Sequence, residues 1–132
     1  MKTVLIVEDD QVNARVFSKI LTKRGGLAVK HTEDVEEVVK MAKSGEADLI
    51  LMDVSLARSS YQGKAVDGIK ITQILKSDPQ TDKLPIILVT AHAMAGDKES
   101  FLKQSGADGY ISKPVVDHQE FVSQIKALLP PD

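Results

Sequence analysis

The chain of 132 residues contains no cysteine and no tryptophan, and it has only two tyrosines and three phenylalanines. The absence of cysteine excludes disulfides and thiolate-bound zinc. No apolar segment near the N-terminus is long enough for a secretory signal, and no apolar run approaches the length of a membrane span. We therefore expect a cytoplasmic protein that does not associate with membranes.

An excess of charge of one sign is lacking as well. The sequence has 17 Lys and Arg residues against 19 Asp and Glu residues, a net charge of −2, so no nucleic-acid binding is expected. Its hydrophobic content of 42% is ordinary for a globular protein, and 132 residues are enough for one domain with a real core. We expect a single domain over residues 1–132 with no output domain attached.

Short apolar runs alternate with helical patterns along the chain. Three runs are fully apolar, as in strands buried on both faces: Val4–Val7, Leu49–Met52 and Ile86–Val89. Leu27–His31 alternates as an edge strand does, and Asp108–Ile111 is a fifth strand. Five strand–helix repeats predict an α/β fold with a doubly wound parallel sheet in the flavodoxin-like order 2-1-3-4-5, in three α/β/α layers.

Amphipathic helices are predicted between and after these strands. Asp10 and Asp34 are suited to cap the first two helices, the second helix ends at Gly45, and the third ends before Asp78. The fourth helix is predicted from Met94 to Ser105. In the first helix, five apolar residues are expected on the buried face: Val12, Val16, Phe17, Ile20 and Leu21.

Polar side chains follow four of the predicted strands, and all four connections open on the same edge of the sheet. They are Glu8 and Asp9, Asp53, Thr90, and Lys113. Three carboxylates at one edge would repel one another and raise at least one pKa unless a cation is bound. Because the ligands are hard oxygens with no cysteine or histidine beside them, we expect Mg²⁺, with Mn²⁺ as an alternative.

This set of groups suits phosphoryl transfer to a carboxylate. An oxygen of Asp53 can attack a phosphoryl group to form an acyl phosphate, while the metal, Lys113 and Thr90 stabilise the phosphoryl oxygens. The simpler interpretations are a turn carboxylate at Asp53, a solvated lysine at Lys113 and an ordinary strand-end threonine at Thr90.

The chain resembles the receiver domain of two-component response regulators, in the CheY-like superfamily. The matching segments are Val7-Glu8-Asp9-Asp10, Leu49–Asp53, Asp67-Gly68, Val89-Thr90-Ala91 and Gly106–Pro114. The resemblance implies a stand-alone receiver in a phosphorelay, in which Asp53 accepts a phosphoryl group from a histidine kinase or a histidine phosphotransfer protein. It also implies that the chain is not an enzyme beyond this self-catalysed transfer and its own dephosphorylation, and that it signals by protein–protein contact.

The same resemblance assigns the ligands of the metal. Asp9, Asp53 and the backbone carbonyl of Ser55 would hold Mg²⁺, and Glu8 would act through a metal-bound water.

The resemblance further assigns a switch. Thr90 would move toward the phosphoryl group, Tyr110 would follow it inward, and Lys113 would pair with the phosphorylated site. Packing at the sheet edge is the plainer interpretation of Tyr110. His92 and Ser55 occupy positions that could tune hydrolysis of the acyl phosphate, although a solvent-facing histidine is an equal alternative at residue 92. His31 and His118 are interpreted as surface residues.

The segment 57–66 departs from the family, which has a shorter connector there. It gates the phosphorylation site or contributes to partner choice, or else it is a tolerated surface insertion. The downstream partner is expected on the fourth helix, the fifth strand and the fifth helix.

Three other functions are alternatives to this interpretation. A haloacid dehalogenase-type phosphatase needs an acid two residues after the nucleophile, where this chain has Ser55. A flavodoxin-type binding module would not place Glu8-Asp9-Asp10 in its phosphate loop. A receiver-fold scaffold that acts independently of phosphorylation stays open.

Overall fold

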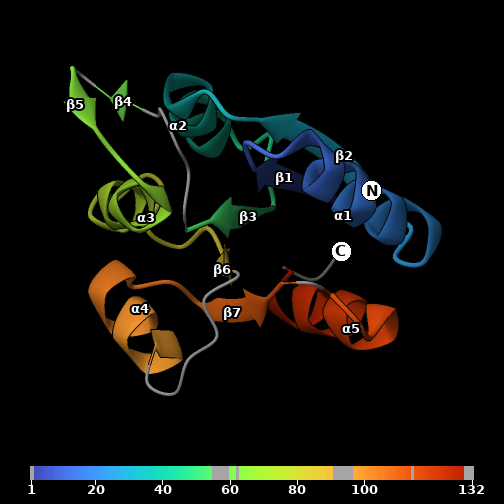
Figure 1. Ribbon diagram of the computed structural model, residues 1–132. Helices are drawn as coiled ribbons and strands as arrows, with labels where there is room; N and C mark the ends of the chain where they lie inside the picture. The colour runs from blue at the N-terminus through green and yellow to red at the C-terminus, as the bar shows by residue number, and fades with distance from the viewer. Residues whose placement is uncertain (1, 55–59, 62, 91–96, 114, 130–132) are drawn as a thin grey trace.

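A five-stranded parallel sheet forms the centre of the computed structural model (Figure 1). The structure describes residues 2–54, 60–61, 63–90, 97–113 and 115–129. The strands of the sheet are β1 (Thr3–Val7), β2 (Ala28–Thr32), β3 (Leu49–Asp53), β6 (Ile86–Thr90) and β7 (Gly109–Ser112). Their order is β2-β1-β3-β6-β7, which confirms the predicted order with β2 at an edge.

Helices cover both faces of the sheet (Figure 1). Two of them, α1 (Gln11–Lys23) and α5 (His118–Leu128), pack on one face, where Phe17 stacks on Phe121 with ring centroids 5.5 Å apart. The other face is covered by α2 (Val35–Ser44), α3 (Gly68–Lys76) and α4 (Asp97–Ser105). Successive strand residues point to opposite faces, so each apolar strand supplies both halves of the core. The three-layer α/β/α architecture is confirmed.

Local signals in the sequence set the helix ends. Four helices begin at an aspartate whose side chain accepts a hydrogen bond from a backbone N–H of the first turn: Asp10, Asp34, Asp67 and Asp117. Helix α2 ends at Gly45, whose φ of 81° is a left-handed conformation that glycine adopts easily. Helix α3 ends before Asp78, as predicted.

The predicted buried face of α1 was partly wrong. Ala14, Phe17, Ile20 and Leu21 are buried, but Val12 is 67% exposed and Val16 is 43% exposed. At 3.6 residues per turn, the five apolar residues predicted to be buried spread over about half of the helix circumference. The sheet covers a narrower stripe than that, and Val12 and Val16 fall outside it.

A short hairpin lies within residues 57–66. Strands β4 (Ser60–Tyr61) and β5 (Lys64–Ala65) pair antiparallel, and β4 contacts α2. Figure 1 shows the hairpin extending beyond the sheet on the side of α2 and α3. The rest of this segment, residues 57–59 and 62, lies outside the described residues.

Among the described residues, no helix combines the length and the apolar content that crossing a membrane requires.

Candidate functional site

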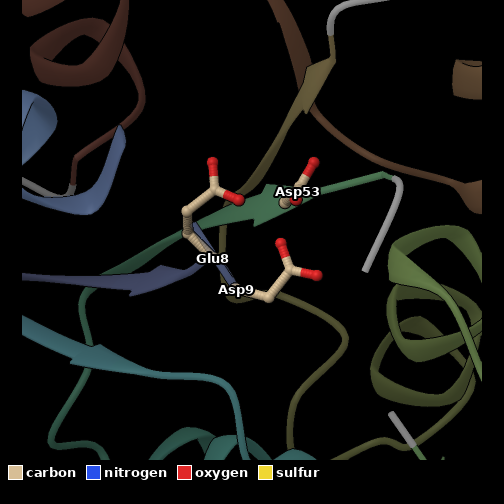
Figure 2. Close-up of side chains that lie close together, drawn as sticks. All are labelled: Glu8, Asp9 and Asp53. Carbon is tan, nitrogen blue, oxygen red and sulfur yellow. The ribbon is translucent and has the colours of Figure 1, made fainter. Parts of the chain in front are cut away.

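The carboxyl edge of the sheet brings together the acidic residues predicted from the sequence. Asp53 is the last residue of β3, while Glu8 and Asp9 directly follow the neighbouring strand β1. One carboxylate oxygen from each of the three residues lies within 4.8 Å of the others (Figure 2). Glu8 and Asp53 are buried, with exposures of 1% and 3%, and Asp9 is partly exposed.

Lys113 lies between two of these carboxylates. Its ammonium group donates hydrogen bonds to Glu8 Oε1 at 3.1 Å and to Asp53 Oδ1 at 3.3 Å. The side chain of Lys113 is only 13% exposed. Its backbone N–H donates to the carbonyl of Thr90 at 2.8 Å, which fixes the residue after β7 to the end of β6. The lysine is therefore part of the acidic site and not a solvated loop residue.

Thr90 completes the set. It is the last residue of β6, is fully buried, and lies in the strand next to β3, where Asp53 pairs with Val89. The chain thus brings a carboxylate cluster, a lysine and a threonine to one edge of the sheet, as its sequence predicts.

Burial and charge act together on the pKa values at this edge. Burial, followed by the hydrogen bond and negative charge of Asp53, raises the pKa of Glu8 from 4.5 to about 7 in spite of Lys113. Burial alone would lower the pKa of Lys113, but the charge of Asp53 and the interactions with Glu8 raise it above its usual value. Lys113 thus offsets part of the negative charge of Glu8 and Asp53, and the raised pKa of Glu8 favours its protonated form more than in an exposed glutamate.

The residues at this edge fit a divalent cation. Glu8, Asp9 and Asp53 offer three closely spaced carboxylate oxygens, and no histidine or cysteine belongs to this described cluster. Such an oxygen-only set suits Mg²⁺ or Mn²⁺. A cation here would also oppose the burial and the negative charge of Asp53, which together raise the pKa of Glu8.

Gly68 shapes the site through the backbone, a role that sequence reasoning did not assign. A Cβ atom at residue 68 would overlap the carbonyl oxygen of Asp53 and lie 3.0 Å from Cα of Val54. The N–H of Gly68 also donates to the carbonyl of Val54 at 3.2 Å. The absence of a side chain therefore lets the start of α3 press against the end of β3. The available signal was a glycine directly after the helix-capping Asp67.

His31 has a structural partner that its interpretation as a surface residue missed. The ring is exposed, but Nε2 lies 2.7 Å from the backbone carbonyl of Glu8. A carbonyl oxygen only accepts hydrogen bonds, so Nε2 carries the proton and donates. Edge strand β2 is thereby tied to the residue that begins the acidic site.

Tyr110 is half-buried in β7 and stacks on Phe101 of α4, with ring centroids 6.4 Å apart. Its position agrees with the packing interpretation and leaves the switch interpretation untested. Ser55 and His92 lie outside the described residues, so the structure places neither of them.

Comparison with known sequences agrees with this geometry. A family model described as the response regulator receiver domain matches residues 4–126. The polar-differentiation response regulator DivK of Brucella anthropi is 36% identical over 128 residues, which cover 97% of this chain and 96% of that protein.

Solved structures are similar over nearly the whole chain. The signal receiver domain of a signal transduction histidine kinase from Syntrophus aciditrophicus has a TM-score of 0.79 at 29% identity, covering 98% of this chain and 90% of that chain. The receiver domain of a sensor histidine kinase from Pseudomonas aeruginosa has a TM-score of 0.78 at 30% identity and covers 96% of each chain. That structure has a magnesium ion coordinated in its active site cleft.

Proposed function

This chain belongs to the response regulator receiver family, and we propose that its Asp53 accepts a phosphoryl group from a histidine kinase or a histidine phosphotransfer protein. The observation that carries the proposal is the placement of Asp53: a buried carboxylate at the end of a central strand, hydrogen-bonded to Lys113 and next to Glu8 and Asp9. The chain would then signal by protein–protein contact, as one step of a phosphorelay.

The transfer forms one bond and breaks one bond. An oxygen of Asp53 bonds to phosphorus, the phosphorus–nitrogen bond to the donor histidine breaks, and the leaving imidazole nitrogen takes up a proton. The product is an acyl phosphate on Asp53. Asp53 attacks the phosphorus, and Lys113 donates hydrogen bonds to the transferred oxygens. Buried Thr90, at the end of the adjacent strand, would donate its hydroxyl to the same oxygens. We propose that the chain is a phosphoacceptor and that it catalyses nothing beyond this transfer and its own dephosphorylation.

Asp9 and Asp53 would hold the Mg²⁺ ion, with the backbone carbonyl of Ser55 as a third ligand and Glu8 reached through a water molecule. When bound, the ion supplies positive charge against the phosphoryl oxygens. The three clustered carboxylates and the raised pKa of Glu8 support this assignment. Mn²⁺ has the same ligand preferences and could take its place.

The switch would run from Thr90 to Tyr110. Thr90 ends β6, and Tyr110 pairs with Leu88 of the same strand while its ring stacks on Phe101 of α4. A movement of Thr90 toward a phosphoryl group would therefore act on the contact between β7 and α4. We place the downstream protein on the surface of α4, β7 and α5. Ser55 and His92 would tune the lifetime of the acyl phosphate.

The phosphoryl donor must approach from the carboxyl edge of the sheet. Three large apolar side chains are strongly exposed in the described part of the chain, namely Val12, Val16 and Val116. Val12 lies in the first turn of α1, three residues after Asp9, and Val116 follows Lys113 by three residues. Exposed apolar groups beside a reactive centre suit a protein partner, so we propose that the donor contacts these valines. The proposal places the reaction in the cytoplasm and involves neither membrane nor nucleic acid.

Residues 57–66 would contribute to the choice of that donor. Strand β4 of their hairpin contacts α2, the segment follows Asp53 closely in the sequence, and Lys64 in the hairpin is exposed. Deletion of residues 58–64 tests this proposal through phosphotransfer rates from several kinases. A change in the preference among kinases supports it, whereas unchanged rates and preferences mean that the hairpin is a tolerated insertion.

The phosphoacceptor is tested by intact-mass measurement after incubation with Mg²⁺ and acetyl phosphate. We expect a gain of one phosphoryl group that is lost in Asp53→Asn and without Mg²⁺. Asp82→Asn is the matched control, because Asp82 is an exposed aspartate outside the acidic cluster. Absence of an adduct in the unaltered protein would favour a receiver-fold scaffold that works without phosphorylation. If Asp53→Asn gained the same phosphoryl group, another residue would be the phosphoacceptor.

A further inference from the structure

The whole chain is nearly neutral, but one segment of it is basic. Residues 11–32, which form α1 and β2, contain five of the 17 Lys and Arg residues and none of the 19 Asp and Glu residues. The remaining residues are therefore strongly acidic on balance. This charge lies away from Lys113, on the helix and the strand at the other edge of the sheet.

Part of this basic segment lines an open groove between α1 and β2. The groove has a volume of about 470 Å³. Buried Ala14 contributes to its wall, and its polar lining includes Arg15, Ser18, Lys19 and Thr22 from α1 and His31 from β2. Among the residues that the structure describes, no acidic side chain and no aromatic residue other than the imidazole of His31 lines it.

Arg15 and Lys19, the two positively charged residues of the groove, form no ion pair with another described residue. Other lysines of the described structure form ion pairs, for example Lys30 with Glu46 and Lys76 with Asp108. Within the part of the chain that is described, neither Arg15 nor Lys19 has such a partner. They lie four residues apart on α1, a spacing at which like charges destabilise a helix. The groove therefore offers two unneutralised cations on adjacent turns.

The neighbouring groups favour a phosphate ligand. Arg15 presents a planar set of donors that matches phosphate oxygens, and Lys19 adds a second positive charge. The hydroxyl of Thr22 donates a hydrogen bond to the carbonyl of Ser18 at 2.9 Å. Ser18 also lines the groove, where its hydroxyl can bind a ligand. His31 is held in the wall by its hydrogen bond to the carbonyl of Glu8. Because no aromatic platform is available for a nucleobase, a compact phosphate ester fits this lining better than a nucleotide does.

We propose that the groove between α1 and β2 binds a compact phosphorylated small molecule, with Arg15 and Lys19 holding its phosphate groups. This site is separate from the phosphoacceptor at Asp53. It would give the receiver a second input besides the phosphoryl donor, whose proposed contacts at Val12 and Val16 lie on the same helix.

The test is a titration of the full chain with fructose 1,6-bisphosphate, followed by backbone amide NMR at constant ionic strength and without Mg²⁺. We expect saturable shifts in residues 14–22 and at His31. Arg15→Gln/Lys19→Gln should weaken binding about tenfold or more, in line with the loss of charge-assisted hydrogen bonds. The matched control is Lys23→Gln/Arg24→Gln, which removes two cations of the same segment that do not line the groove and should change affinity less than about twofold.

Several outcomes would overturn the proposal. Shifts centred on Lys113 and Asp53 would place the ligand in the phosphoacceptor site. If both double variants weakened bisphosphate binding equally, or if sulfate bound as tightly as the bisphosphate, the groove would attract anions in general and would not be a specific site. Binding of a poly-glutamate peptide at α1 without binding of the bisphosphate would make the groove a protein contact. Because Asp53 phosphorylation is measured separately by mass, failure here leaves the phosphoacceptor result unaffected.

Discussion

The carboxyl edge of the sheet and the groove between α1 and β2 both crowd like charges, but they differ in burial. At the edge, Glu8 and Asp53 are almost fully buried, and the pKa of Glu8 rises to about 7. In the groove, Arg15 and Lys19 are exposed, and water screens their repulsion. Buried like charges therefore shift the pKa of one of the groups, whereas exposed like charges are screened by solvent. Four substitutions test this difference between the acidic edge and the groove.

Lys113→Met should have the largest effect on stability and on phosphorylation. It leaves the buried carboxylates of Glu8 and Asp53 without their cation, so the free energy of unfolding should fall by about 3 kcal/mol without metal. The rate of acyl phosphate formation should fall about 100-fold, as expected for loss of a charge-stabilising donor. Lys19→Met, in the exposed groove, should change stability by no more than about 0.5 kcal/mol. Urea unfolding and intact-mass kinetics measure both effects, and equal losses in the two variants would contradict the comparison.

The pH dependence of stability isolates the proton on Glu8. Its pKa in the folded chain is about 7 against 4.5 ordinarily, so between these values the folded state binds more protons than the unfolded state. Stability should therefore fall as the pH rises from about 4.5 to about 7, by up to about 3 kcal/mol. Glu8→Gln should lack this contribution. Urea unfolding of both proteins in EDTA across this range measures it, and parallel pH profiles would show that Glu8 titrates normally.

Gly68→Ala tests how far the acidic edge depends on backbone packing. A methyl group would meet the backbone of Asp53 and Val54, which cannot rotate away, so we expect a loss of about 1–3 kcal/mol and slower phosphorylation. Gly109→Ala is the control, because its methyl group would lie 3.2 Å from the side chain of Ile87, which can adjust. A loss of about 1 kcal/mol or less is expected there. A harmless Gly68→Ala would contradict the proposed close approach.

Lys19→Gln should have the smallest effect and the opposite sign. Lys19 has Arg15 and Lys23 four residues away on either side, so its removal should stabilise α1 by about 0.5 kcal/mol at low salt. The gain should disappear at about 1 M NaCl, where the Debye length is about 3 Å. Lys40→Gln, which removes a lysine four residues after Glu36 in α2, should destabilise the chain slightly. Thermal unfolding at two salt concentrations separates the two signs.

Local patterns were sufficient to predict most of the fold. Fully apolar runs became the central strands β1, β3 and β6, because only strands covered on both faces can bury every side chain. The caps at Asp10 and Asp34 formed as predicted, since capping is an interaction within one helical turn. The convergence of Glu8, Asp9, Asp53 and Lys113 was also predictable, because the carboxyl ends of parallel strands share one edge.

Other features depended on contacts between distant segments. The exposure of Val12 and Val16 follows from how far the sheet extends under α1, and the role of Gly68 follows from the approach of α3 to β3. The hydrogen bond from His31 to Glu8 joins two strands 23 residues apart in the sequence.

The strand order, the helix ends at Asp10, Asp34, Gly45 and Asp78, and the set of groups at the acidic edge thus follow from periodicity and short-range chemistry in the sequence. Which charges are buried, which described cations form no ion pair and which helix face stays exposed depend on the tertiary structure. Those properties depend on the distances between segments far apart in the chain, and residue spacing does not encode such distances.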